Sequence, residues 1–163
     1  MLGRSFSALQ LALGIALVGS LLAIFIPSFL RNLHASRLTE AVRGVNAIAT
    51  GAVLYAEGKM PAEAFPPSAP LTPAEVPRVK PVEDPPGTWE HLTWAALGFR
   101  MDHAHFFCFA FDSNLGPTRS TFVARAHGDL DGDGELSTFE IHGEAVPGGA
   151  RILPGIFVDR EVE

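Results

Sequence analysis

The sequence predicts an α+β protein, in which one long N-terminal helix packs against a small antiparallel β-sheet. Three observations lead to this prediction. Residues 6–30 form an apolar run without a charge. Residues 31–58 continue it with apolar residues at every third or fourth position, and residues 88–163 alternate short apolar segments with turn-forming Asp, Gly and Pro.

The apolar run is long enough to cross a membrane. It lies between Arg4 and Arg31 and contains only four polar side chains. About 20 apolar residues span the hydrocarbon core, and a spanning segment must be helical to satisfy its own backbone polar groups. A secretory signal peptide is the alternative, but its apolar part is usually about 7–15 residues and ends at a small-residue cleavage site. We therefore expect residues 6–30 to be a transmembrane helix that stays on the protein.

Residues 31–58 predict an amphipathic continuation of the same helix. The stripe comprises Leu30, Leu33, Leu38, Ala41, Val42, Val45, Ile48, Ala49, Ala52 and Tyr55. This spacing places the apolar side chains on one helix face, which needs a folded partner. Gly58, followed by Pro61, predicts that the helix ends near Glu57.

At this point the N-terminal sequence resembles a known family. Phe6 opens the apolar run, Pro27 follows 21 residues later, and the sequence SFLRNLHASRLTEA continues the helix. This pattern is similar to the N-terminal helix of type IV pilins and of the pseudopilins of type II secretion. The resemblance implies a pilin-like fold and cleavage between Ser5 and Phe6, with residues 1–5 as a short leader-like segment. It also implies assembly with like or related subunits through the helix that contains Gln10 and Pro27.

The resemblance further implies a location and partners. The subunit would sit in the bacterial inner membrane as a single-pass protein, with its globular domain in the periplasm. It would join a periplasmic or extracellular filament through a pilus or type II secretion machinery. The sequence does not distinguish these two machineries.

Two positions depart from the family pattern. Family members usually carry a glutamate four residues after the phenylalanine, where this chain has Gln10, and a glycine before it, where this chain has Ser5. A carboxylate at position 10 can neutralise the N-terminal amine of a neighbouring subunit, whereas the amide of Gln10 can only form hydrogen bonds. These departures favour an alternative, a membrane-tethered calcium-binding module of the periplasm or cell exterior that does not polymerise.

Charge and cysteine content exclude other classes. Residues 59–163 contain sixteen Asp and Glu against eight Lys and Arg. Nucleic-acid binding requires basic patches, so we expect no nucleic-acid partner. The single cysteine, Cys108, excludes an intramolecular disulfide framework, and its neighbours HFFCFAF indicate a small buried side chain rather than a reactive thiol.

Residues 59–87 form a connector that contains nine prolines. Proline interrupts helices and removes strand donors, so we expect an extended segment that wraps over the sheet and helix, or else a loop that contacts a partner. The sequences PAEAF and TPAEV could each form one helical turn.

Residues 88–163 predict a small sheet. Thr88 is expected to cap a short helix that ends at Gly98. Strands are expected at 103–111, 120–127 and 136–145, with a final edge over 151–159.

The segment 128–140, GDLDGDGELSTFE, predicts a calcium loop. Asp129, Asp131, Asp133 and Glu140 match the acidic positions of an EF-hand loop, and Gly134 permits its sharp turn. Glu135 would add its carbonyl oxygen, and Ser137 would act through water. The flanking segments resemble strands rather than helices, so the loop would lie within a hairpin.

Other interpretations of these residues remain open. The loop could be a solvated Asp-Gly turn, or bind magnesium, which rarely fills a cage of protein oxygens alone. A zinc site would need several of His103, His105, His127 and His142 to converge. No nucleophile motif or phosphate-binding loop is visible, so we expect no enzyme. A membrane-anchored enzyme with the metal loop as its active site ranks last, because seven protein oxygens would leave no position for a substrate.

Overall fold

The computed structural model describes residues 7–160, with the side chains of residues 30–36 left out. It divides into two compact units, one ending at Ser36 and the other beginning at Arg37. Helix α1 (Ala8–Tyr55) contributes to both units, and we describe each unit by itself.

The first unit consists of the N-terminal part of α1. The helix begins with a reciprocal pair of hydrogen bonds: Gln10 N donates to Ser7 Oγ (3.2 Å), and Ser7 N donates to Gln10 Oε1 (3.0 Å). This arrangement is a capping box, which satisfies backbone donors that have no partner within the helix. Pro27 lies inside α1, and the helix continues through it.

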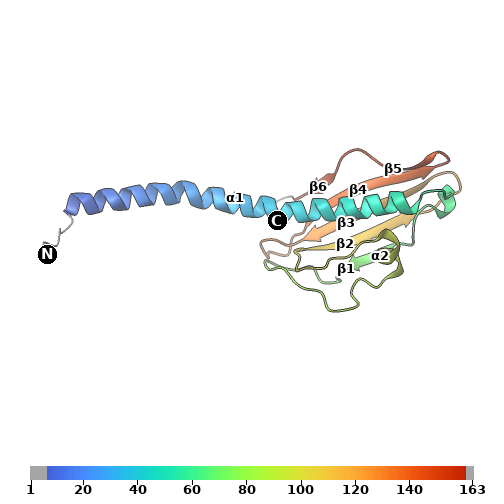
Figure 1. Cartoon of the computed structure of the whole chain (residues 1–163), viewed down its shortest axis with the longest axis horizontal. Helices are drawn as coiled ribbons and strands as arrows, with labels where there is room; N and C mark the ends of the chain where they lie inside the picture. The colour runs from blue at the N-terminus through green and yellow to red at the C-terminus, as the bar shows by residue number, and fades with distance from the viewer. Residues whose placement is uncertain (1–6, 161–163) are drawn as a thin grey trace. The chain divides into compact units, whose positions relative to one another are not determined.

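The second unit contains an antiparallel sheet (Figure 1). Its strands are β1 (Ala69–Thr72), β2 (Phe107–Asn114), β3 (Ser120–Gly128), β4 (Ser137–Val146), β5 (Gly149–Ile152) and β6 (Phe157–Asp159). Strands β1 to β5 follow one another in order across the sheet, and β6 pairs with β4 beside β5. The described chain is therefore an α+β protein, as predicted.

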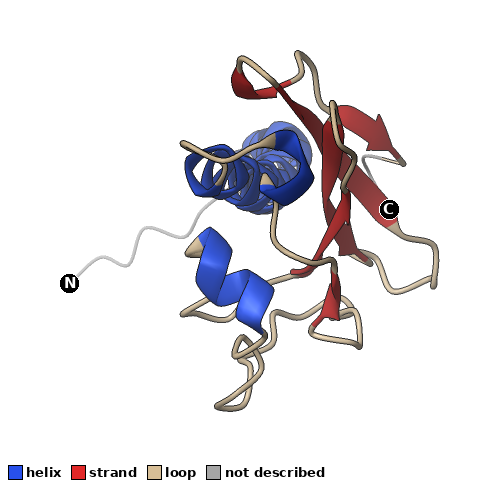
Figure 2. Ribbon diagram, turned by 90° about the vertical axis from the view of Figure 1, so that its right-hand side faces the viewer, coloured by secondary structure: helices blue, strands red, loops and turns tan. Residues whose placement is uncertain are grey.

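Helices cover one face of this sheet (Figure 2). The α1 residues from Ala41 to Ala52 that point inward are fully buried, and they pack with aromatic side chains of β2, β3 and β4. At Gly44 the helix approaches so closely that an added Cβ would lie 2.1 Å from the Phe109 ring. Helix α2 (Leu92–Leu97) buries Trp94 and Leu97 in the same core. The predicted amphipathic face is confirmed for the described side chains.

The ends of several elements differ from the prediction. Helix α1 ends at Tyr55, two residues earlier than expected. Helix α2 begins at Leu92 and is capped by His91, whose ring accepts a hydrogen bond from Thr93 N. The Thr88 hydroxyl does not cap the helix but donates to the Pro85 carbonyl within a turn.

Strand β2 begins at Phe107 rather than at 103. The backbone N–H groups of Phe106 and Phe107 donate to Glu40 Oε1 of α1 (2.8 and 3.1 Å). His105 pairs instead with Val82 of the connector. Contacts with α1 and with the connector therefore replace the strand pairing that was expected for residues 103–106.

The connector contains regular structure that the sequence did not predict. Strand β1 includes Pro70 and lies at the edge of the sheet, where one missing donor is tolerated. The sequence PAE forms a 3₁₀ turn (Pro61–Glu63), as expected for one of the two candidate turns. In the segment TPAEV, Thr72 ends β1 and residues 73–75 form a bend, so the second candidate helical turn is absent.

Candidate metal centre

The acidic loop joins β3 to β4 and is shaped by its own aspartates. Asp129 Oδ1 accepts a hydrogen bond from Gly132 N (2.7 Å), and Asp133 Oδ1 accepts one from Glu135 N (2.7 Å). Gly132 and Gly134 have φ of 87° and 95°. A residue with a side chain would be strained in this backbone conformation. The turns curl the loop so that its carboxylates face one another.

Three carboxylates converge in this loop. Asp129, Asp131 and Asp133 each offer one oxygen, and the three oxygens lie within 4.8 Å of one another. Calcium binds oxygen at about 2.3–2.6 Å, so two ligands of one ion can be at most about 5 Å apart. The described geometry therefore fits one shared cation, which would relieve the repulsion between the carboxylates.

Asp129 has the least satisfied carboxylate of the three. Its side chain is only 1% exposed, and no hydrogen bond reaches Oδ2 in the part of the chain that the structure describes. Oδ2 forms an ion pair with Arg78 of the connector, whose Nε lies 3.6 Å away. A buried carboxylate oxygen with so few partners is costly, and a bound cation would satisfy it.

The other predicted ligands lie differently. The Glu135 carboxylate pairs with Arg160 Nη1 at 2.7 Å. Ser137 is the first residue of β4 and is buried opposite Gly128. The Glu135 carboxylate does not belong to the described cluster of three aspartates. The ligand predicted at this position is the backbone carbonyl of Glu135, not its carboxylate.

Glu140 lies within β4, outside the aspartate cluster. Its Oε1 accepts a hydrogen bond from Arg125 Nε (2.5 Å), and its Oε2 lies 3.2 Å from His142 Nε2. Burial raises the pKa of Glu140, but the bonds from Arg125 and His142 outweigh burial and hold the pKa below its usual range. To close the loop on a cation, Glu140 would have to leave both partners.

The histidines do not converge on a metal. In the described residues, the only group of three or more metal-binding side chains is the aspartate cluster. His127 Nδ1 lies 2.9 Å from Thr138 Oγ1. Burial, followed by the charge of Arg125, lowers the pKa of His127.

His105 belongs to a buried polar network that sequence reasoning missed. Its Nδ1 lies 2.7 Å from the Phe107 carbonyl and its Nε2 lies 2.8 Å from Asp84 Oδ2. Asp84 Oδ2 also accepts a hydrogen bond from Trp89 Nε1 at 2.6 Å. The network ties the connector to the start of β2. Its members are separated along the chain, and no local pattern could have indicated it.

Cys108 is fully buried beneath the connector, as predicted. Its thiol donates to the Glu75 carbonyl (Sγ–O 3.3 Å). Burial, assisted by the charge of Asp84, raises the pKa of the Cys108 thiol to about 12. The thiolate is therefore scarce at neutral pH, which makes this side chain unreactive.

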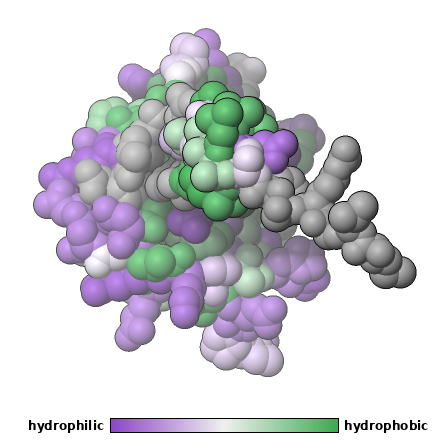
Figure 3. Space-filling view, turned by 90° about the vertical axis from the view of Figure 1, so that its left-hand side faces the viewer, coloured by the Kyte–Doolittle hydropathy of each residue, from purple (hydrophilic) through white to green (hydrophobic). Residues whose placement is uncertain are grey.

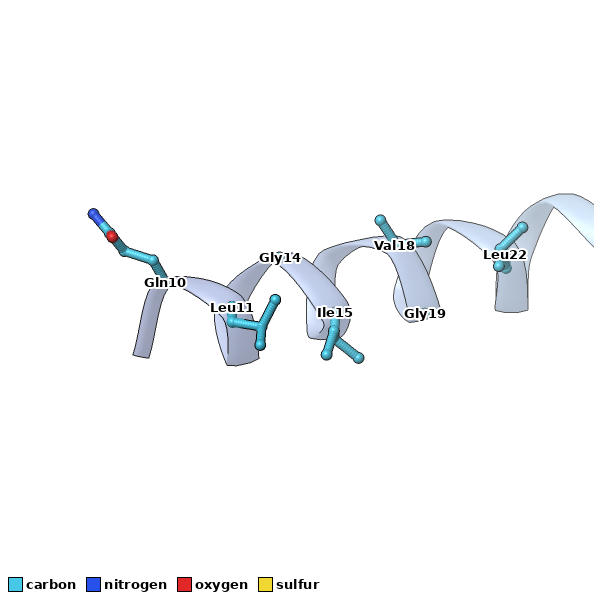
Figure 4. Close-up of a pocket in the computed structure, with 7 residues that line it drawn as sticks. All are labelled: Gln10, Leu11, Gly14, Ile15, Val18, Gly19 and Leu22. Carbon is cyan, nitrogen blue, oxygen red and sulfur yellow. The ribbon is translucent and has the colours of Figure 1, made fainter. Parts of the chain in front are cut away.

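The second candidate functional region is the first part of α1. Residues Ala8–Phe29 form a helix long and apolar enough to cross a membrane, and none of this stretch is buried. Figure 3 shows its apolar side chains in green. One side of the helix has a shallow groove (Figure 4), lined by Gln10, Leu11, Gly14, Ile15, Val18, Gly19 and Leu22.

The predicted processing site lies outside the described residues, since these begin at Ser7. Gln10 is described, and its amide is engaged locally with Ser7. Pro27 lacks an N–H and so leaves the carbonyl of Ala23 without its usual helical donor.

Comparisons with protein-family models, curated proteins and solved structures found no match for this chain. The assignment of function therefore depends on the residues and on their geometry.

Proposed function

We propose that this protein is a pilin-like structural subunit of a type IV pilus or a secretion pseudopilus, with an exposed domain stabilised by calcium. One observation carries the proposal. A 22-residue apolar stretch, Ala8–Phe29, continues without interruption into a helical segment whose apolar face is buried on an antiparallel sheet. A simple membrane anchor has no need to extend directly into the core of the domain that it holds.

The apolar surface of Ala8–Phe29 supports two successive roles. Before assembly it would hold the subunit in the inner membrane with the domain in the periplasm. After assembly the same surface would pack against the helices of like subunits, which removes it from water and lipid alike. The groove at Gly14 and Gly19 allows close approach of another helix, as small residues do in membrane helix pairs.

Calcium is the cation that we assign to the loop. Three carboxylate oxygens within 4.8 Å provide hard ligands, and carbonyls and water would complete the six to eight that calcium takes. Cation binding would fix the β3–β4 connection and so stiffen the domain that faces solvent in a filament. The proposed role of the ion is therefore structural.

Photo-crosslinking in the bacterium that carries the gene tests assembly. A photoreactive amino acid at Leu11 or Leu22 should give crosslinked dimers and higher oligomers, which should also appear in sheared surface or periplasmic filaments. The same probe at Arg100, an exposed position of the globular unit, should give far fewer crosslinked dimers and oligomers. Mass spectrometry of the mature N-terminus should find Phe6. Monomers only, with Met1 intact, would contradict the proposal.

The alternative is a membrane-tethered calcium-binding module that does not polymerise. Gln10 favours it, because the amide is used in the helix cap and brings no negative charge to the N-terminal region. If the filament proposal is right, Gln10→Glu should keep the capping box and increase incorporation, since a carboxylate could also pair with a neighbouring amine. If wild type and Gln10→Glu both remain monomeric, the tethered module is favoured.

A further inference from the structure

We infer that Arg78 of the connector is a built-in competitor of the cation at the acidic loop and sets the affinity of the site. This inference rests on the proposed cation site and adds a residue to it that the loop motif does not contain. Arg78 is about fifty positions upstream of the aspartates, so no spacing rule relates it to them.

The geometry places Arg78 at the one oxygen that needs a partner. Arg78 Nε lies 3.6 Å from Asp129 Oδ2, which accepts no hydrogen bond among the described residues. The backbone beside it is held in place, because Val79 N donates to the Asp129 carbonyl at 3.0 Å. The backbone therefore keeps the guanidinium within reach of the carboxylate, while the Arg78 side chain itself is 71% exposed.

A cation and the Arg78 guanidinium cannot both occupy this position favourably. Calcium bound to Asp129 Oδ2 would lie at most about 6 Å from Arg78 Nε, since the Ca–O distance is about 2.4 Å and the present N–O distance is 3.6 Å. Two positive groups at this distance repel each other, particularly beside a buried carboxylate. Arg78 is exposed and can swing into solvent, so it is the group that yields.

The surroundings leave room for this exchange. A cleft of about 560 Å³ lies between the connector and the loop, lined by Glu75, Val76, Arg78, Asp129, Gly134 and Leu136. An ion can reach Asp129 through this cleft without opening the core. Without a cation, Arg78 partly neutralises the loop and ties the connector to it. With a cation bound, that ion pair is lost.

Isothermal titration calorimetry with CaCl₂ on the full-length protein in a nonionic detergent tests this inference. At low ionic strength, Arg78→Gln should lower the calcium Kd by about two- to tenfold, because the competing ion pair and the repulsion both disappear. Arg78→Lys keeps the charge and should bind close to wild type. Higher salt should narrow the difference between wild type and Arg78→Gln.

Arg100→Gln is the matched control. Arg100 is equally exposed (71%) and pairs with Asp102 rather than with a carboxylate of the loop, and this variant changes the net charge by the same amount. It should leave the calcium Kd at the wild-type value. An equal gain in affinity in Arg100→Gln would show a general charge effect and overturn the role of Arg78.

The remaining outcomes separate the inference from the proposed cation site. If wild type binds calcium and Arg78→Gln binds with the same or weaker affinity, the competitor role is wrong while the site stands. If neither protein binds calcium, the cation site itself fails and the inference fails with it. Melting curves in chelator should show that both Arg78 variants remain folded.

Discussion

At the scale of single residues, the buried carboxylate of Asp129 and the half-buried carboxylate of Glu40 are satisfied in different ways. Asp129 pairs with an exposed arginine, Arg78, and its Oδ2 accepts no hydrogen bond among the described residues, which leaves it available to a cation. Glu40 instead accepts two backbone N–H groups at the start of β2, so it holds α1 against the sheet. The first arrangement suits a binding site and the second suits a permanent structural contact.

The Glu40 contact predicts a specific pH dependence. Burial raises the pKa of Glu40, and the bonds from Phe106 and Phe107 only partly offset this. A carboxyl group whose pKa is higher in the folded protein contributes stability below its unfolded pKa, and this contribution is lost as pH rises through the folded pKa. Glu40→Gln cannot ionise, so its melting temperature relative to wild type should be a few degrees higher at pH 7 than at pH 4.

Thermal melts at pH 4 and pH 7 provide the measurement. Glu57→Gln, at an exposed position just after α1, is the control. The difference between its melting temperature and that of wild type should change little with pH. If the melting temperature of Glu40→Gln relative to wild type is the same at both pH values, or is higher at pH 4, the pKa of Glu40 is not raised in the folded protein.

At the scale of elements, the decisive contact is the close approach of α1 to the sheet. Glycine at position 44 allows the helix backbone to rest on the Phe109 ring, and glycine at 51 allows the same helix to approach the Leu97 carbonyl of α2. Glycine is a poor helix former, at a cost of about 1 kcal/mol relative to alanine. Tertiary packing compensates for this cost.

Gly44→Ala should therefore destabilise the protein despite its better helix propensity. An added methyl would lie 2.1 Å from a ring atom of Phe109, and overpacking of this kind typically costs about 1–3 kcal/mol. Thr50→Ala, at an exposed position of the same helix, should be neutral or slightly stabilising. Chemical denaturation of both variants checks this. A more stable Gly44→Ala would mean that the helix does not approach β2 so closely.

At the scale of the whole molecule, the connector joins separate parts of the globular unit. It adds β1 to the sheet edge, pairs with Asp129 through Arg78 and Val79, and pairs with His105 through Val82. The region that the sequence presents as a proline-rich loop is therefore docked along much of its length, and the Pro66 and Pro67 carbonyls and Asp84 add further contacts. A cation at the acidic loop should act on this assembly as well as on the β3–β4 turn.

Calcium should raise the melting temperature of the full-length protein in detergent. A ligand that binds only the folded state adds RT ln(1 + [L]/Kd) to stability. Extracellular calcium modules bind at about 10⁻⁴–10⁻³ M, so low-millimolar calcium should add about 1–2 kcal/mol, or several degrees. Asp129→Asn should abolish this shift, whereas Asp102→Asn, an exposed position outside the loop, should retain it.

Glu140→Gln completes the same experiment. A shift that survives in this variant would place the site on the three aspartates. A lost shift would mean that Glu140 leaves Arg125 and His142 to bind the ion. A wild-type melt that does not respond to calcium would reduce the loop to an acidic turn.

The sequence by itself determined the features that depend on local pattern. Helical periodicity identified the buried face of α1, alternation identified β3 and most of β4, and Asp-Gly spacing identified the acidic loop. Each of these signals lies within a short window, because backbone geometry relates neighbouring residues directly.

Only the tertiary structure decided the features that depend on distant partners. Pro70 lies in a strand because an edge position needs no donor on its outer side, and His105 is buried because Asp84 and the Phe107 carbonyl satisfy its ring nitrogens. Glu140 fits the twelfth position of a calcium loop by spacing, yet β-sheet register places it opposite Arg125. The pairing of residues across strands is set by the packing of the whole domain, and no local spacing contains that information.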